Sequence, residues 1–188
     1  MRSVTYSMGI SLDGFIVGPD GEIITAPPPD AEVWQLVMDE IRGVDVHLMG
    51  RRLYETMLYW EAADPDAPFD DDERAWAAVW NPLPKVVFST TLSSVQGSAR
   101  PATGSLVDEI ARLRAEPGEG DIAIGGAALA AEAAALDLID EYRIRVYPLL
   151  VGGGTPYFPV AGRSAELELV EARTFSGGMV YLRYRVVH

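Results

Sequence analysis

Three short apolar runs, each ending in small or hydroxyl residues, constrain the fold of this chain more than any other feature. They are Val44–Met49 before Gly50, Lys85–Phe88 before Ser89, and Asp121–Ile124 before Gly125. Segments with helical periodicity separate them, and strands that alternate with helices predict an α/β sandwich with parallel neighbours in its middle. Two later strands, 142–151 and 179–187, carry arginines that we expect to point outward, and they predict an antiparallel close to the sheet.

The first strand shows the two-residue period of a β-strand most plainly. Val4 and Tyr6 begin an apolar face that continues to Leu12, while the positions between hold serine, threonine and glycine. Such a face of small residues allows another element or a flat ligand to approach closely. The strand ends at Asp13-Gly14, a pair typical of turns.

Helices are expected at 30–41 with Asp30 as N-cap, 51–60, 72–80, 105–113 with a capping box of Ser105 and Asp108, and 127–136. The glycine run 151–158 follows a strand and does not open a helix, so we expect it to be a flexible turn.

Length and composition narrow the class of protein. The chain has 188 residues and 48% hydrophobic composition, which predicts one domain over 1–188. It contains no apolar run of the roughly 18 residues that a membrane helix needs, and it enters a strand at once, so we expect no signal peptide. A net charge of −13 argues against nucleic-acid or anionic-membrane binding, and the lack of cysteine excludes disulfides and thiolate chemistry. A cytoplasmic protein is expected.

The three strand ends suggest a phosphate-bearing ligand. In open α/β sheets, ligands bind beyond the carboxyl ends of the strands, where glycine lets backbone N–H groups approach a phosphate. Two ends carry glycine at Gly50 and Gly125, and hydroxyls follow the third at Ser89. The alternative is ordinary turn chemistry, because neither a GxxxxGK[ST] nor a GxGxxG motif is present. Three such ends together favour a dinucleotide.

Six segments in order carry a resemblance to a known family: SLDGFI, LMGRRLYE, KVVFSTTL, IAIGGAALA, IDEYRIRVYPLLVGGGTPYF and RTFSGGMVYLRYRV. The chain resembles the dihydrofolate reductase-like superfamily, and most closely a stand-alone form of the reductase domain of bifunctional riboflavin-biosynthesis enzymes. The resemblance implies a three-layer α/β/α sandwich with a mixed, mostly parallel sheet and antiparallel C-terminal strands. It also implies hydride transfer from NADPH to a small molecule, and a homodimer.

The resemblance further implies where the cofactor binds. Leu12, Gly14 and Ile16 would lie near the nicotinamide ribose, with Asp13 beside them. Gly50, Arg51 and Arg52 would hold the adenosine-side phosphates, and Ser89 and Thr90 would reach toward the adenosine 2′-phosphate. The pyrophosphate would be held by Gly125, Gly126, Ala127 and Leu129, with Ile124 as a further cofactor position. In such reductases the peptide between the paired glycines is often cis.

Three positions depart from the pattern of the family. Leu53 replaces a threonine after the arginines, and Thr90 replaces an arginine, which leaves NADH open as a cofactor. Ile124 stands where dedicated riboflavin reductases have a glutamate, and their DDP segment is absent. These changes argue against a housekeeping riboflavin role.

The proton donor is the least defined part of the site. Asp13 is the best-placed carboxylate, although turn chemistry is the more common role for such a residue. The helix over 30–41 offers Asp39 and Glu40, which we expect to face solvent, so folate is not the expected substrate. His47 is expected to be structural, and no metal site is expected.

Aromatic residues offer a substrate wall or, alternatively, core packing. The candidates are Trp34, Tyr54 and Tyr157, with Trp60 as a further member. Three functions remain open: a reductase of a small heterocycle or carbonyl compound, a dimeric nucleotide-binding module without turnover, and a true 5-amino-6-(5-phosphoribosylamino)uracil reductase.

Overall fold

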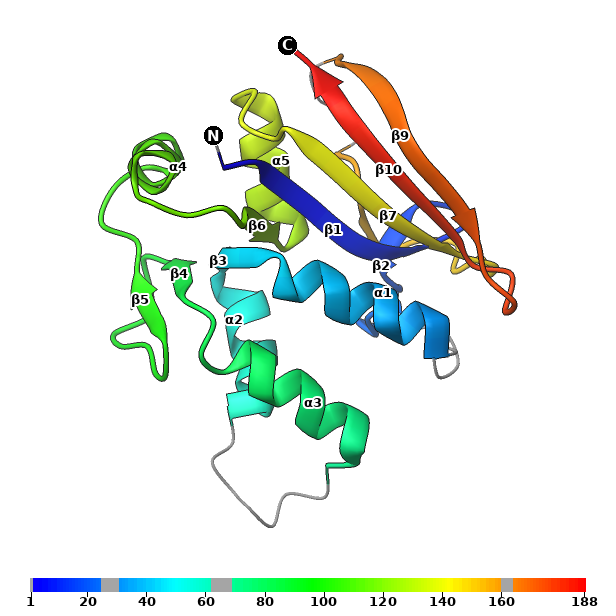
Figure 1. Ribbon diagram of the computed structural model, residues 1–188, viewed down its shortest axis with the longest axis horizontal. Coiled ribbons are helices and arrows are strands. Elements are labelled where there is room, and N and C mark those ends of the chain that lie inside the picture. Colours follow the sequence, from blue (N-terminus) through cyan, green and yellow to red (C-terminus); the bar gives the residue numbers. More distant parts are fainter. Residues whose placement is uncertain (1, 25–30, 62–68, 160–163) are drawn as a thin grey trace.

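The computed structural model of the protein describes residues 2–24, 31–61, 69–159 and 164–188. Its main element is an eight-stranded sheet with the order β5-β4-β3-β6-β1-β7-β10-β9 (Figure 1). The strands in that order are Ala99–Pro101, Lys85–Phe88, Val44–Gly50, Asp121–Gly125, Val4–Ser11, Glu141–Tyr147, Val180–Val187 and Glu166–Thr174. All neighbours from β5 to β7 are parallel, and β7, β10 and β9 are antiparallel. The predicted mixed sheet with an antiparallel C-terminal end is confirmed.

Helices cover both faces of this sheet. On one face α1 (Ala31–Arg42), α2 (Arg51–Met57) and α3 (Asp71–Trp80) share an apolar cluster with β3 and β4, and a 3-10 turn at Leu58–Glu61 follows α2. On the other face α4 (Leu106–Ala115) and α5 (Ala127–Ala135) pack on β3, β6 and β1. The alternation of β3 explains both clusters, because Leu48 points into one and Met49 into the other. The predicted three layers are confirmed.

Local sequence signals account for most helix boundaries. The capping box of Ser105 and Asp108 is present, and a second one, formed by Asp70 and Glu73, opens α3. Trp76 and Trp80 lie four residues apart in α3, with their ring centroids at 6.0 Å. The N-cap predicted at Asp30 lies outside the described residues. In the parts of the chain that the structure describes, no helix is both long and apolar enough to cross a bilayer.

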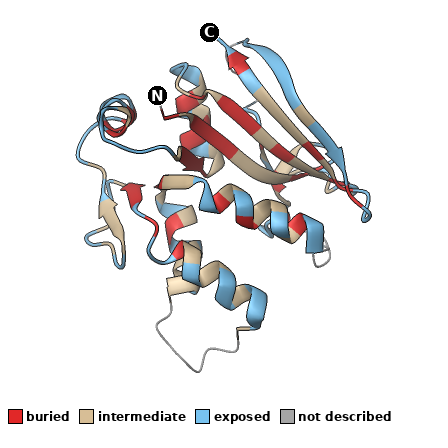
Figure 2. Ribbon diagram, in the orientation of Figure 1, coloured by how far each residue is buried: buried red, intermediate tan, exposed pale blue. Residues whose placement is uncertain are grey.

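The face of small residues on β1 allows the close approach that the sequence predicts. A side chain at Gly9 would meet the ring of Tyr147, whose Cε2 atom lies 2.7 Å from the position a Cβ would take. Ser7 on the same face donates a hydrogen bond to Glu40 of α1. β1 is therefore covered on both sides: Figure 2 shows its first residues in red as buried, and its middle in tan as partly buried.

The strand β9 was not expected from the sequence. Its residues, ELELVEART, include glutamate, leucine and alanine, which favour helix by propensity. Pairing with β10 along the whole strand overrides this propensity. β9 is the edge of the sheet and is almost entirely exposed (Figure 2).

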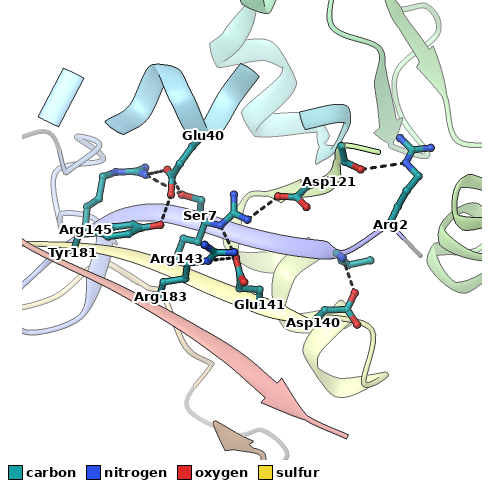
Figure 3. Close-up of polar contacts among 12 residues, drawn as sticks. Arg2, Ser7, Glu40, Asp121, Asp140, Glu141, Arg143, Arg145, Tyr181 and Arg183 are labelled. Carbon is teal, nitrogen blue, oxygen red and sulfur yellow. Dashed lines mark hydrogen bonds and ion pairs between the residues drawn. The ribbon is translucent and has the colours of Figure 1, made fainter. Parts of the chain in front are cut away.

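Glu40 corrects the expectation that this acid faces solvent. Its carboxylate pairs with Arg145 of β7 and accepts hydrogen bonds from the hydroxyls of Ser7 and Tyr181, each at 2.9 Å (Figure 3). The side chains of Glu40 and Arg145 are only 12% and 13% exposed. Asp39 does face solvent. The small side chains of β1 leave space between the strand and α1, and Arg145 of β7 fills this space. The local sequence pattern around Glu40 could not predict this contact, because Arg145 lies far away along the chain.

Arg143 is likewise not the outward arginine that the sequence predicts. It lies 11% exposed between Asp121 and Glu141, at 2.7 Å from each carboxylate. Glu141 also pairs with Arg183 at 2.7 Å. Burial opposes ionisation of Glu141, but the guanidiniums of Arg183 and Arg143 outweigh it and lower the pKa of this carboxyl. These ion pairs hold β6, β7 and β10 together beside the contact with α1.

We predict that Glu40→Gln lowers the free energy of unfolding by about 3 kcal/mol, because it leaves the Arg145 guanidinium uncompensated in a largely buried place. Urea denaturation measures this change. The control is Glu168→Gln, which removes an exposed pair with Arg185 and should cost less than about 1 kcal/mol. Equal losses in the two variants would contradict the prediction.

Candidate functional site

Parallel pairing brings the predicted strand ends to one edge of the sheet. In the register of β3, Met49 pairs with Gly125 of β6 and Gly50 pairs with Phe88 of β4. The segments that follow these strands therefore emerge side by side. The structure thus gathers the glycines and hydroxyls that the sequence singled out, at the place where α/β sheets bind ligands.

An open cleft lies beside β4 at this edge. It has a volume of about 710 Å³ and is lined by Arg51, Phe88, Ser89, Thr90, Thr91, Ala102, Thr103 and Gly104. Three predicted site residues, Arg51, Ser89 and Thr90, meet here. Arg52 is exposed on α2 but does not line this cleft.

Both walls of the cleft are held by side-chain hydrogen bonds. The Ser89 hydroxyl accepts from the backbone N–H groups of Thr91 and Leu92, each at 3.1 Å. On the opposite wall the buried carboxylate of Glu109 accepts from the N–H of Thr103 at 2.7 Å and from its hydroxyl at 3.0 Å. Arg100 binds the same carboxylate through two nitrogens. Glu109 was not predicted from the sequence, because Arg100 and Thr103, which bind its carboxylate, come from β5 and the loop after it.

Gly50 leaves space that the fold itself does not use. It is the N-cap of α2 with φ −79°, a conformation open to any residue, and no side chain caps the helix there. A Cβ at Gly50 would meet no atom within 4 Å. Neither backbone nor packing requires glycine here, so the open space is suited to close approach of a ligand.

At the end of β6, in contrast, the fold itself requires glycine at both Gly125 and Gly126. Gly126 has φ +89°, which side chains rarely adopt, and begins α5. A Cβ at Gly125 would lie 2.4 Å from Cδ2 of Leu53 and 2.5 Å from Cε1 of His47. The expected cis peptide is wrong: the described residues contain no cis bond, and the positive φ of Gly126 makes the turn.

Three predicted cofactor residues, Ile124, Leu129 and Ile16, have side chains in the core. Ile124 is 1% exposed and Leu129 is 6% exposed, both on the α5 side of the sheet. Their side chains cannot touch a ligand at the strand ends, so only their backbone remains available. Leu12 is 64% exposed, and Ala127 is partly exposed. Ile16 is buried at 4%.

Asp13 is an acceptor in this structure and is not suited to donate a proton. Its exposed carboxylate accepts hydrogen bonds from the backbone N–H groups of Val151 at 3.2 Å and Gly152 at 2.8 Å. Hydrogen bonding from the Ser11 hydroxyl, and then from these backbone groups, lowers its pKa. A group that stays ionised at neutral pH matches the turn chemistry expected for an aspartate before glycine.

The predicted aromatic wall is wrong. Tyr157 is 2% exposed, stacks on Tyr6 at 4.3 Å and donates its hydroxyl to the carbonyl of Tyr6. Tyr54 lies in the cluster on the other face, where its hydroxyl accepts from the N–H of Gln96. Trp34 packs against that second cluster, as does Trp60. These rings serve the core because their strands and helices direct them to opposite sides of the sheet.

His47 is structural, as expected. Its ring meets the edge of Trp80 at 5.3 Å and lies below Gly125, and its Nδ1 atom has no hydrogen-bond partner among the described residues. Burial lowers its pKa from 6.5 to about 4. The imidazole is therefore neutral at physiological pH.

The family match and the most similar solved structures described here both relate this chain to the riboflavin-biosynthesis proteins. The family described as the RibD C-terminal domain matches residues 2–181. The Bacillus subtilis (strain 168) protein YyaP, itself uncharacterised, is 29% identical over 97% of this chain and 94% of its own length. Among solved structures, a Shewanella protein whose provisional name is riboflavin biosynthesis protein is 25% identical, covers all of both chains and has a TM-score of 0.74.

A Thermotoga maritima structure named as a diaminohydroxyphosphoribosylaminopyrimidine deaminase and 5-amino-6-(5-phosphoribosylamino)uracil reductase shares the fold. It is 14% identical with a TM-score of 0.66, and the match covers 99% of this chain and 57% of that one.

We predict that His47 makes stability fall on acidification. The unfolded chain binds a proton near pH 6.5 and the folded chain only near pH 4, so stability is full above pH 6.5 and is lost as pH falls toward 4. The loss attributable to this group is about 3 kcal/mol. Urea denaturation at several pH values should show a flatter profile for His47→Leu than for the natural chain between these limits. Parallel profiles would contradict the prediction.

Proposed function

The chain belongs to the RibD C-terminal domain family, and from this membership we propose that it is a reductase that transfers hydride from NADPH to a small heterocyclic or carbonyl compound. The observation that carries the proposal is the cleft at the strand ends, where Arg51, Ser89 and Thr90 lie together beside the open space at Gly50. The reductase named in the Thermotoga maritima structure supports the reaction class.

The residues of the site suit a dinucleotide phosphate. Arg51 would bind the 2′-phosphate, because guanidinium groups recognise phosphate through several donors. Thr90 and Thr91 would add hydroxyl donors at the same wall. Gly50 would let phosphate approach the backbone, and Gly125-Gly126 would lie beneath the pyrophosphate.

NADPH supplies the hydride when bound, and the chain must orient the acceptor and allow a proton to reach it. Asp13 is held ionised by its donors, and Glu40 is engaged by Arg145, Ser7 and Tyr181. Neither acid is free to donate, so we assign the proton to solvent water. This assignment also separates the protein from reductases that use a helix carboxylate.

The choice of NADPH over NADH depends on Arg51. It pairs with Glu55 across one helical turn at 3.3 Å, and both side chains are about half exposed. Exposed pairs of this kind are weak, so a phosphate can displace the carboxylate. The two alternatives are a nucleotide-binding module of this fold without turnover and a true riboflavin-pathway reductase.

Gly50→Asp provides a sharp test of nucleotide binding. Aspartate is at least as good an N-cap as glycine, so the melting temperature without ligand should stay equal or rise slightly. Its carboxylate would repel the phosphates, and the protection that millimolar NADPH gives in a thermal melt should correspond to binding about 10-fold weaker or worse. Gly50→Asn is the matched uncharged control.

Oxidation of NADPH, followed by its absorbance with a panel of pterins, pyrimidines and quinones, separates the reductase from the binding module. Absence of protection by either NADPH or NADH would overturn the proposal. Protection without oxidation of NADPH by any acceptor would favour the binding module.

We also propose a homodimer. One face of β10 and β9 presents Leu169 and Leu167, at 53% and 40% exposed, in register with Tyr184 and Val186. Phe158, 48% exposed, packs on Tyr142 of the neighbouring strand β7. Exposed apolar side chains next to the outermost strand of a sheet are typical of an association surface.

Light scattering after gel filtration should give twice the 20.4 kDa of one chain. Leu169→Glu should give the single-chain mass, because a charge would be buried at the interface. Val107→Glu on α4, at a position 44% exposed, is the control and should leave the dimer intact. A natural chain that elutes as a monomer at all concentrations would contradict this proposal.

A further inference from the structure

Two loops lie side by side at the carboxyl ends of β1 and β7. The strands pair in parallel up to Ser11 and Tyr147, so the segment 12–14 emerges next to the segment 148–154. The N–H of Leu12 donates to the carbonyl of Leu149 at 2.8 Å, and the N–H of Tyr157 donates to the carbonyl of Gly14 at 2.9 Å. The loops are therefore tied at both ends.

Asp13 makes the contact between those two ties. Each of its oxygens accepts one backbone N–H of the glycine turn, from Val151 and Gly152. The turn that the glycine run predicted to be flexible therefore carries two hydrogen bonds to a side chain of the other loop. Beyond it, β8 (Thr155–Pro156) pairs with β2 (Phe15–Val17).

The structure requires glycine at two of the three glycine positions of this turn, for different reasons. Gly154 has φ +121°, and a Cβ there would lie 2.0 Å from the carbonyl oxygen of Val17, so the fold requires glycine. Gly152 has φ +73°, which also favours glycine. Gly153 has no positive φ, and a Cβ there would meet nothing within 4 Å. Like Gly50 and Gly177, Gly153 is a glycine that neither the backbone conformation nor the packing requires.

The two loops expose large apolar side chains. Leu12 and Leu150, one from each loop, are 64% and 72% exposed, more than any other large apolar side chain in the described residues. Asp13 is the sole charged residue in the segments 12–14 and 149–157. On these two loops the Asp13 carboxylate would repel a phosphorylated substrate, and no cation would bind its phosphate. A flat uncharged ring could instead contact the two leucines and the backbone at Gly153.

We propose that Asp13 is a positioning residue that holds the turn Val151–Gly154 so that Leu12, Leu150 and Gly153 receive the flat ring of an uncharged, unphosphorylated electron acceptor. The inference rests on the proposed reductase function and narrows its substrate class to compounds such as quinones or pteridines. The proposal gives Asp13 a role in positioning the two loops and no role in proton transfer.

The first arm of the test is independent of turnover. Hydrogen exchange of the natural chain, Asp13→Ala and Asp13→Asn should show faster exchange at the amides of residues 150–153 in the alanine variant, with a smaller effect for asparagine, which keeps one acceptor oxygen. Asp20→Ala, an exposed aspartate in the next turn, is the control and should leave these amides unchanged. Unchanged exchange in Asp13→Ala would overturn the contact.

The second arm measures the acceptor. With a quinone or pteridine that the natural enzyme reduces, Asp13→Ala should raise the KM of the acceptor about 10-fold or more, since small displacements of positioning groups have large effects. The affinity for NADPH in the thermal melt should fall by a smaller factor than the KM rises, because these loops lie outside the adenosine cleft and would meet only the nicotinamide end of the cofactor. Asp13→Asn should recover part of the loss.

Two results would overturn the role or the substrate class. A fall in kcat with an altered pH profile and an unchanged KM would make Asp13 the proton donor. A higher kcat/KM for a phosphoribosyl pyrimidine than for its unphosphorylated base would defeat the uncharged substrate. Lack of NADPH protection in the natural chain would defeat the proposed function, while hydrogen exchange would still decide the contact of Asp13.

Discussion

β1 pairs in parallel with β6 on one side and with β7 on the other, and this pairing sets the position of every functional element. Because neighbouring parallel strands end at the same edge, the loops after β1, β3, β4 and β6 converge there. The loop after β7 joins them through Asp13. The adenosine cleft and the leucine-lined surface thus lie at one edge of the sheet, on either side of the β6 end.

Buried ion pairs stabilise the same sheet on the side that α1 covers. Glu40 pins α1 to β1, β7 and β10, and Arg143 connects β6 and β7 through Asp121 and Glu141 (Figure 3). These groups lie along the strands and away from their carboxyl ends. They are compensated by one another, as buried charges must be. The acid on the helix after the first strand therefore belongs to the ion pairs and hydrogen bonds that join α1 to the sheet.

Glycines separate into two classes that sequence cannot distinguish. Gly126 and Gly154 are required by positive φ, and Gly9 and Gly125 by close packing. Gly50, Gly153 and Gly177 are required by neither, and the first two border the edge where the ligand is proposed to bind. Open space at a glycine of ordinary backbone conformation therefore narrows the glycines that a ligand could approach to a few.

Periodicity in the sequence determined the central parallel strands and the helices of this protein, though not β5 or β9, because alternation of two and of 3.6 residues reports which side of each element is buried. The strand ends at Gly50, Ser89 and Gly125 were predictable for the same reason. Tertiary structure alone decided that Glu40 is buried, that Tyr54 and Tyr157 lie on opposite faces, and that Asp13 binds the glycine turn. Each of these contacts joins residues far apart along the chain, so it depends on which strands become neighbours, and local pattern carries no information about that choice.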